Sequence, residues 1–217
     1  MPKESFEARE MRAKKILAKL TVLYPDAHCA LEFTNAFELL AATILSAQCT
    51  DERVNIVMKQ FRPRFPSPKS LADADLPEIE EIVRSTGFFR QKAKSLKSMA
   101  TDIVEKFGGK VPKTMEDLVT LRGVGRKTAS VVLWNAFGIN SGIAVDTHVM
   151  RVAGRMLKLT TETDQAKIEQ DLMQLYPQKD WGMVTHYFIS HGRKICIANR
   201  PKCELCGINT LCPSSKV

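Results

Sequence analysis

Lys127 is the residue of this 217-residue chain with the clearest potential for covalent chemistry. It belongs to the segment Leu121-Arg-Gly-Val-Gly-Arg-Lys-Thr-Ala129 and stands at the start of a helix predicted over residues 126–137. The positive end of a helix disfavours a second positive charge, so it lowers the pKa of an amine placed there. An uncharged lysine amine is a nucleophile that can form a Schiff base. A lysine that only binds phosphate is the alternative interpretation.

The residues before this lysine, Gly123, Val124 and Gly125, predict a tight turn. Glycine permits positive φ angles and close approach of another backbone. The N–H groups of the turn, together with those of Arg126 and the start of the next helix, can hold an anion. Between two helices, this arrangement is a helix–hairpin–helix motif that grasps DNA phosphate without reading sequence. A Walker A loop is the competing motif, but it requires glycine directly before the lysine, where this chain has Arg126.

Asp146 is the candidate partner of Lys127. The helix over residues 126–137 rises about 16–18 Å, and the following segment up to Asp146 can extend to roughly 30 Å. The chain can therefore return to the start of that helix. Asp146 also precedes a predicted helix, so it can serve as an N-cap, and the two roles are compatible.

Four cysteines near the C-terminus predict a metal site. Their spacing is C-x6-C-x2-C-x5-C, and the ligands are Cys196, Cys203, Cys206 and Cys212. Four thiolates suit either a zinc ion or an iron–sulfur cluster. Zinc ribbons usually offer two close pairs, whereas this chain has one close pair flanked by two single cysteines, which favours a cluster. The tail has too few apolar residues to fold alone, so the metal should hold it together.

Basic residues point to a polyanionic partner. The chain carries 32 Lys and Arg against 24 Asp and Glu, a net charge of +8, and such a surface gains affinity for DNA by releasing counterions from phosphates. Arg200 and Lys202 lie between the first two cysteines, where they can contact a phosphate backbone or form a solvated loop. A basic protein without such a partner is the alternative.

Helical periodicity dominates the chain, and the alternation typical of strands is nearly absent. We therefore expect an all-α fold, in which the hairpin precedes one helix and Asp146 precedes another. No apolar stretch reaches the roughly 18 residues of a membrane span. The main helices are predicted at residues 5–23, 36–46, 51–62, 77–83, 90–107, 114–121, 126–137, 147–156, 162–175 and 181–194.

Taken together, the motifs resemble endonuclease III of the helix–hairpin–helix DNA glycosylases. The resemblance is carried by LRGVGRKTA, AVDTHVMRV, the cysteine tail and FELLAATILSAQCTD, in order from Phe37 to Cys212. It implies two helical lobes with the active-site cleft between them. Residues 29–141 would form a six-helix lobe that includes the hairpin, and residues 1–28 and 142–217 would form the iron–sulfur cluster lobe.

The resemblance also implies the chemistry. Lys127 and Asp146 match the catalytic lysine and aspartate of that family, and the four cysteines match its [4Fe–4S] ligands. The implied activity is that of a bifunctional DNA glycosylase and abasic-site lyase acting on double-stranded DNA that contains oxidised or saturated pyrimidines or abasic sites. We expect a monomer in the cytoplasm, associated with the nucleoid and not with a membrane. A non-catalytic DNA-binding module and an electron carrier are the alternatives, and Lys127 and the basic charge disfavour them.

Two further residues acquire roles only from the resemblance. Gln48 matches the residue that enters the space left by an everted nucleotide, and Phe88 falls where the family commonly has leucine as a second wedge. An aromatic wedge can stack on the orphaned base. Thr86 and Cys49 also depart from the family pattern, which leaves the preferred lesion and opposite base open.

Overall fold

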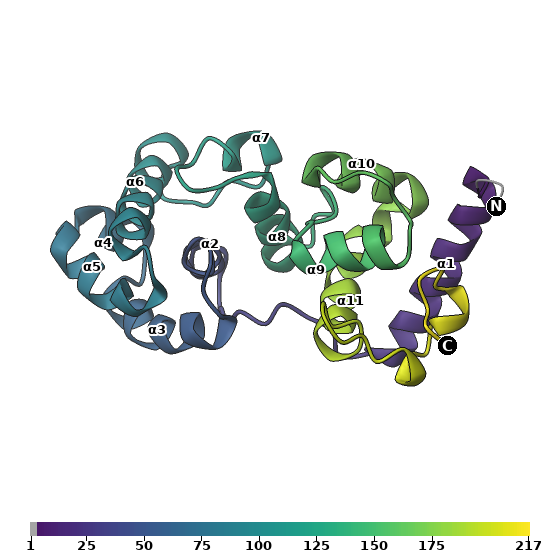
Figure 1. Cartoon of the computed structure of the whole chain (residues 1–217). Helices are drawn as coiled ribbons and strands as arrows, with labels where there is room; N and C mark the ends of the chain where they lie inside the picture. The colour runs from purple at the N-terminus through teal and green to yellow at the C-terminus, as the bar shows by residue number, and fades with distance from the viewer. Residues whose placement is uncertain (1–3) are drawn as a thin grey trace. The chain divides into compact units, whose positions relative to one another are not determined.

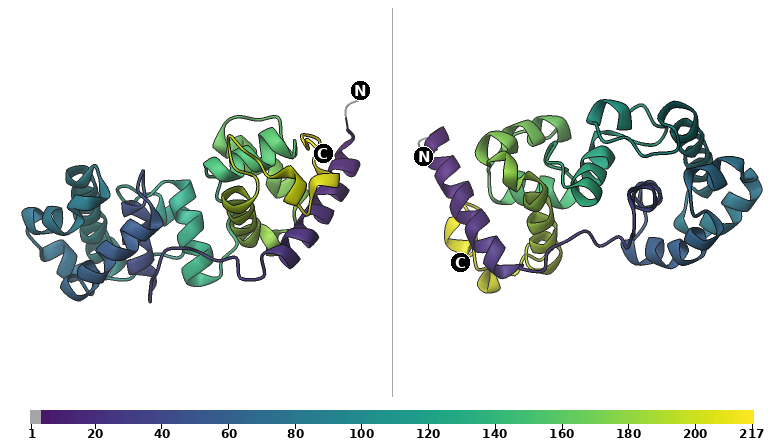
Figure 2. Two further views of the ribbon diagram at one scale, coloured as in Figure 1. Left: turned by 60° about the horizontal axis from the view of Figure 1, so that its bottom comes forward. Right: turned by 180° about the vertical axis from the view of Figure 1, so that it is seen from behind.

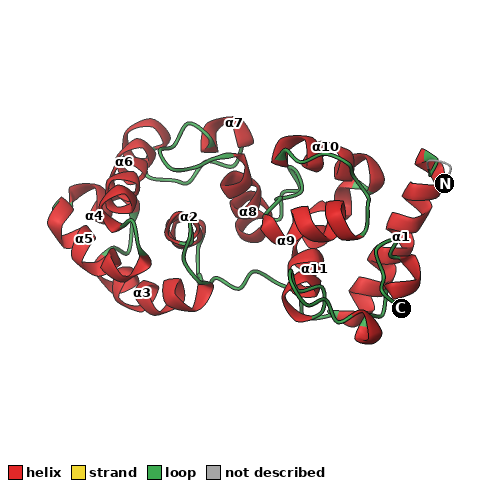
Figure 3. Cartoon of the chain, in the orientation of Figure 1, coloured by secondary structure: helices red, strands yellow, loops and turns green. Residues whose placement is uncertain are grey.

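The computed structural model describes residues 4–217, which contain helices and loops and no strand (Figures 1 and 3). The all-α class predicted from periodicity is therefore confirmed. The chain divides into two compact units, with divisions between His28 and Cys29 and between Ile139 and Asn140. We call residues 29–139 the hairpin unit, and residues 4–28 with 140–217 the terminal unit.

The hairpin unit is built around one buried helix, α2 (Ala36–Leu45). Figure 1 shows α2 nearly end-on, and it contacts α3, α6 and α8 of the same unit. Seven of its ten residues are buried, and burial of each leucine contributes about 1.5–3 kcal/mol. The other elements of this unit are α3 (Asp51–Arg64), α4 (Pro68–Asp73), α5 (Leu76–Val83), η1 (Arg84–Thr86), α6 (Phe89–Phe107), α7 (Met115–Leu118) and α8 (Arg126–Phe137).

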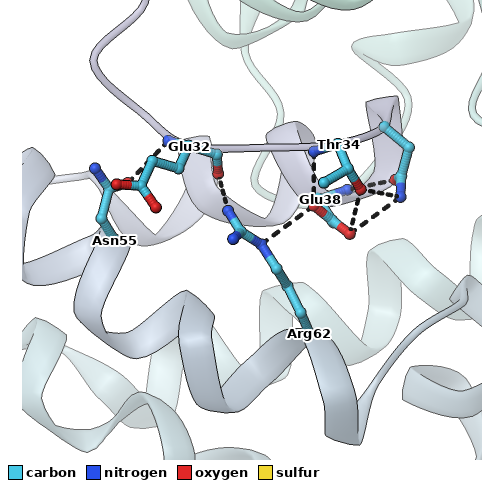
Figure 4. Close-up of polar contacts among 6 residues, drawn as sticks. Glu32, Thr34, Glu38, Asn55 and Arg62 are labelled. Carbon is cyan, nitrogen blue, oxygen red and sulfur yellow. Dashed lines mark hydrogen bonds and ion pairs between the residues drawn. The ribbon is translucent and has the colours of Figure 1, made fainter.

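A polar network fixes the segment before α2 to helix α3 (Figure 4). The Glu38 carboxylate accepts a hydrogen bond from the Thr34 N–H at 2.8 Å and pairs with the Arg62 guanidinium at 3.2 Å. Arg62 also donates to the Glu32 carbonyl, and Asn55 of α3 accepts from the Glu32 N–H at 2.9 Å. The start of α2 is thereby held against α3.

Helix α3 begins at Asp51, as predicted, but it ends later than expected. Thr50 is its N-cap, because its side chain accepts from the Arg53 N–H at 3.3 Å. The helix continues through Pro63 to Arg64 instead of ending before the proline. A proline in the last turn removes one hydrogen bond, and the edge-to-face packing of Phe61 and Phe65, with ring centroids 5.1 Å apart, favours continuing the helix.

The terminal unit joins the two ends of the chain (Figure 2). Helix α1 (Phe6–Leu23) contacts α10 (Gln165–Leu175), α11 (Trp181–Lys194) and η5 (Asn209–Leu211). Ala13, Ile16 and Leu20 of α1 are fully buried in the core of this unit. Its other elements are α9 (Thr147–Val149), the π-helix η2 (Met150–Met156), η3 (Gln178–Asp180) and η4 (Cys203–Leu205).

No helix within the described part of the chain is both long enough and apolar enough to cross a bilayer.

Candidate active site and metal centre

Lys127 is the second residue of α8, and its side chain is exposed. The helix has the bounds that the sequence predicted, Arg126–Phe137. Its N-cap is Gly125, which provides no side chain, and its first turn contains no acidic residue. The amine therefore stands at a helix N-terminus whose partial positive charge is not offset by an acidic residue within that turn.

The turn before α8 has one glycine directed into the protein and one directed away from it. Gly123 has φ +84°, and a Cβ built there would lie 3.0 Å from the Cβ of Ser95 on α6. Val124 between the glycines is buried. Gly125 has φ −92°, and a Cβ added there would meet nothing within 4 Å. The turn is thus anchored through Gly123 and Val124, and its Gly125 face is open to a ligand such as a phosphate.

Asp146 is the N-cap of α9, as the sequence predicted. Its Oδ1 accepts from the Val149 N–H at 2.8 Å, and the residue is half-buried. The capping bond holds the carboxylate in one orientation at the start of the helix. Lys127 belongs to the hairpin unit and Asp146 to the terminal unit, so the structure defines the surroundings of each within its own unit.

Gln48 and Phe88 share an uncommon backbone conformation. Their φ angles are +53° and +48°, in the left-handed region that residues other than glycine rarely occupy. Both side chains are exposed, and Phe88 retains 69% of its accessible surface. Gln48 follows the end of α2, and Phe88 precedes α6. Two exposed side chains on strained backbone are a common feature of binding sites.

The four cysteines predicted as ligands line one pocket of the terminal unit. Cys203 begins η4, Cys206 follows it, Cys212 follows η5, and Cys196 lies just after α11. All four are free thiols. The other side chains that line the pocket are mostly apolar, and they include Val152, Met156, Leu157, Ile195 and Ile208.

The environment of these thiols is unfavourable to negative charge without a cation. Burial, opposed by Arg151 and assisted by the other three cysteines, raises the pKa of Cys196 to about 11. Burial also raises the pKa of Cys206 and of Cys212. Bound metal compensates for this cost, because it replaces the protons on the sulfurs.

Four thiols around one pocket are a donor set of the kind that holds an iron–sulfur cluster. Zinc needs its sulfurs at about 2.3 Å from one point, whereas a [4Fe–4S] cluster is held by four thiolates arranged around a larger body. Four cysteines spread around one apolar pocket satisfy the second requirement.

Supporting side chains surround the cysteine pocket. His191 Nδ1 lies 2.9 Å from the Tyr24 hydroxyl, and its Nε2 lies 3.6 Å from Cys206 Sγ. The Arg151 guanidinium donates to the carbonyls of Cys196 and Gly192 at 3.1 and 3.0 Å. Arg151 therefore supports the backbone of the segment that contains Cys196.

Arg200 and Lys202 are exposed on the loop between Cys196 and Cys203. The Lys202 N–H donates to the Ile195 carbonyl at 2.9 Å, which closes the loop. The positive side chains are therefore presented on a short loop bounded by two of the candidate ligands.

Comparisons with known proteins identify the family. Residues 41–178 match the HhH-GPD superfamily of base excision DNA repair proteins. The chain is 51% identical over 209 residues to Endonuclease III of Synechocystis sp., an alignment that covers 96% of this chain and 95% of the relative. This chain belongs to the endonuclease III family.

Solved structures agree with this assignment. The structure of a non-covalent endonuclease III–DNA complex has a TM-score of 0.90 and 38% identity, and covers 95% of this chain and 96% of that one. A trapped endonuclease III–DNA covalent intermediate has the same TM-score and identity, and covers 95% and 97%. As a member of the endonuclease III family, this chain is a base excision repair enzyme, a DNA glycosylase with abasic-site lyase activity. The enzyme class implied by the sequence motifs is confirmed.

One residue of the hairpin unit was missed by the sequence analysis. Lys92 lies in the helix predicted over residues 90–107 and was given no role there, but its side chain is buried. The available signal was its position on α6, since Ser95, Leu96 and Met99 lie three, four and seven residues further on and are buried as well.

Proposed function

We propose that this enzyme excises oxidised or saturated pyrimidines from double-stranded DNA and cleaves the strand 3′ to the resulting abasic site, with Lys127 as the nucleophile. The observation that carries the proposal is the placement of Lys127, an exposed amine at the N-terminus of α8 directly after the Gly123–Gly125 turn. A substrate in chromosomal DNA implies that the enzyme works in the cytoplasm at the nucleoid, and one chain supplies all the proposed site residues, so a monomer suffices.

The reaction begins with a nucleotide rotated out of the duplex, because its glycosidic bond cannot be reached within the base stack. The Lys127 amine attacks C1′ of the sugar, the C1′–N bond breaks, and the base leaves with the bonding electrons and takes up a proton. Opening of the sugar ring gives a Schiff base between Lys127 and C1′. The Schiff base acidifies the proton on C2′, and loss of that proton expels the 3′ phosphate by β-elimination.

Asp146 is the proposed assisting carboxylate. It accepts a proton from the Lys127 amine and stabilises the positive charge that develops on the sugar. Its capping bond to Val149 leaves the second carboxylate oxygen for this task. The role rests on the family match of AVDTHVMRV and on the fixed orientation of the carboxylate.

DNA binding is assigned to three groups of residues. The Gly123–Val124–Gly125 turn and Arg126 hold a phosphate through backbone N–H groups and positive charge, and Arg200 and Lys202 contact the backbone elsewhere. Gln48 and Phe88 enter the space that the everted nucleotide leaves. The exposure of all these residues except Val124 supports the assignment.

Cys196, Cys203, Cys206 and Cys212 are the proposed ligands of a [4Fe–4S] cluster. When bound, the cluster stabilises the tail by replacing the core that this segment lacks. Arg200 and Lys202 are thereby kept on a closed loop. The purified protein is expected to be yellow-brown, with four iron atoms per chain as expected for such a cluster, and a colourless protein that contains zinc would contradict this assignment.

The deciding experiment is borohydride trapping on duplex DNA with one abasic site, comparing the unmodified enzyme with Lys127→Gln. The unmodified enzyme should give a covalent adduct, and the variant should lose trapping and strand cleavage by on the order of 10³-fold or more. Lys69→Gln, an exposed lysine on α4, is the matched control and should trap normally. An adduct that persists in Lys127→Gln would refute the assignment, and no adduct with either protein would favour a non-catalytic DNA-binding module. A panel of duplexes with different damaged bases, scored for base release, tests the substrate class.

A further inference from the structure

Lys92 connects the two segments that carry Gln48 and Phe88. Its Nζ donates to the Leu45 carbonyl at 2.8 Å and to the Thr86 carbonyl at 2.7 Å. Leu45 is the last residue of α2, three positions before Gln48, and Thr86 is the last residue of η1, two positions before Phe88. One ammonium group therefore holds two loop segments that are far apart in the sequence.

The carbonyls that Lys92 binds are ones that a helix leaves without an internal partner. The final carbonyls of a helical segment have no intrahelical donor and carry partial negative charge. Two such ends, from α2 and η1, converge on the same ammonium. The side chain of Lys92 retains only 5% of its accessible surface, and burial lowers the pKa of its amine while the Cys49 thiolate raises it.

The backbone of Lys92 also contacts Phe88, the second of the two side chains proposed to enter the duplex. Its N–H donates to the Phe88 carbonyl at 3.1 Å, the first turn of α6. Gln48 and Phe88 are two of only three residues other than glycine with positive φ among the described residues. Such conformations persist only where the surroundings enforce them, and Lys92 is bonded next to both.

The same face of α6 reaches the phosphate-binding turn. Ser95 lies one turn after Lys92, and its Cβ is 3.0 Å from the position of a Cβ at Gly123. Lys92 and Ser95 are both buried. One side of α6 thus contacts the Gln48 segment, the Phe88 segment and the turn before Lys127.

We propose that Lys92 is a positioning residue, whose bonds to the Leu45 and Thr86 carbonyls set the spacing between Gln48 and Phe88 so that both side chains enter the duplex together. This inference rests on the proposed function, which assigns those two side chains to the space left by the everted nucleotide. Lys92 contacts neither the sugar nor the base in this scheme, so it affects the reaction on duplex DNA and leaves the intrinsic reactivity of Lys127 unchanged.

The first test measures the activity of Lys92→Met on two substrates. This change keeps the length of the side chain and removes its donors. An abasic site in duplex DNA has an orphaned base to displace, whereas the same site in a single strand has none. The rate of borohydride trapping should fall by about 10-fold to 100-fold on the duplex and by no more than about 2-fold on the single strand. Lys127→Gln should remove trapping on both, so failure of the proposed function is distinguishable.

Equal losses on both substrates, or no loss on either, would overturn the inference. The first result would mean that Lys92 supports folding only. If Lys92→Met does not fold, Lys92→Gln, which retains a donor of shorter reach, is assayed in its place under the same criterion. Thermal unfolding of each variant sets an assay temperature at which the protein is folded.

A double-mutant cycle with Phe88→Ala is the second test. If Lys92 acts through the wedge residues, Lys92→Met should cost less than about 3-fold on duplex DNA once Phe88 is absent, because little remains to be positioned. If the fold-losses of the two single variants multiply in the double variant, the two residues act independently and the proposal is contradicted. The fluorescence of 2-aminopurine opposite the abasic site gives a readout independent of chemistry, and the insertion signal of the unmodified enzyme should be lost in Lys92→Met.

Discussion

The hairpin unit and the C-terminal part of the terminal unit position their functional residues by different means. In the hairpin unit, apolar packing around α2 and the carbonyl contacts of Lys92 hold the segments that carry Gln48, Phe88 and Lys127. In the terminal unit, residues 196–217 contain only two short 3₁₀ turns, η4 and η5. Four cysteines of this tail line one pocket, and the metal centre proposed there would stabilise the tail.

This difference separates two sources of stability. A packed unit loses stability gradually as contacts are removed, whereas a segment held by ligands depends on each ligand. The terminal unit differs in its ionisable groups as well, because all four histidines of the chain belong to it. The two units should therefore respond differently to loss of metal, to acid and to strain in the backbone.

Loss of one proposed ligand should have the largest effect. In Cys206→Ser the cluster should be absent and the tail from residue 196 should become sensitive to protease, since structural metal sites contribute on the order of 10 kcal/mol to folding. Iron content, visible absorbance and limited proteolysis measure the change. Cys29→Ser, which alters a cysteine of the hairpin unit outside the proposed ligand set, is the matched control. A Cys206→Ser protein that keeps its iron and a resistant tail would show that the two regions are not held differently.

Acid should destabilise the terminal unit more than the hairpin unit. Burial, with a smaller effect of His28, lowers the pKa of His186 from 6.5 to about 4. Between these values the unfolded chain binds a proton that the folded chain excludes, so the stabilisation is complete above pH 6.5 and is lost as pH falls toward 4. The expected loss from pH 7 to pH 5 is about 2 kcal/mol.

Urea unfolding at both pH values, followed by hydrogen exchange in each unit, measures this loss. The difference in the free energy of unfolding between pH 7 and pH 5 should be smaller in His186→Gln. His28→Gln, at an exposed position, should change this difference much less. An unaltered pH dependence in His186→Gln would remove His186 as its source.

The smallest expected effect separates the two glycines of the hairpin. Gly123→Ala should lower the stability of the hairpin unit by about 1–2 kcal/mol, because φ is +84° and the new Cβ would meet Ser95. Gly125→Ala should leave stability nearly unchanged, since φ is −92° and the site is open. Thermal unfolding measures the stability of the two variants, and their affinity for duplex DNA is measured separately. Equal destabilisation by both changes would contradict the anchored and open assignment of the two positions.

Local signals explain what the sequence could predict. The Gly–Val–Gly turn followed by an uninterrupted helical pattern located α8 at its observed bounds, and Asp146 before a helical pattern located an N-cap. These features depend on a few neighbouring residues. The cysteine spacing within a short tail is likewise a local signal, and the four thiols line one pocket, although their role as ligands stays a prediction.

Features that depend on distant contacts could not be predicted. The helical spacing of Lys92 to Ser95, Leu96 and Met99 indicates its face of α6, but the two carbonyls of Leu45 and Thr86 that bind its ammonium come from distant segments. The π-helix from Met150 to Met156 has no simple sequence signature. The short helix α4 was missed, although its Ser67–Pro68 start is a recognisable cap.

The division of the chain has a consequence for biosynthesis. The hairpin unit is continuous in sequence, so it can fold on the ribosome once residue 139 has emerged, while synthesis proceeds. Helix α1 precedes the hairpin unit in the chain, yet its apolar face is covered by α10 and α11, which follow that unit, and the cysteine segment comes after them. A newly made chain therefore carries an uncovered amphipathic helix until α10 and α11 have been made.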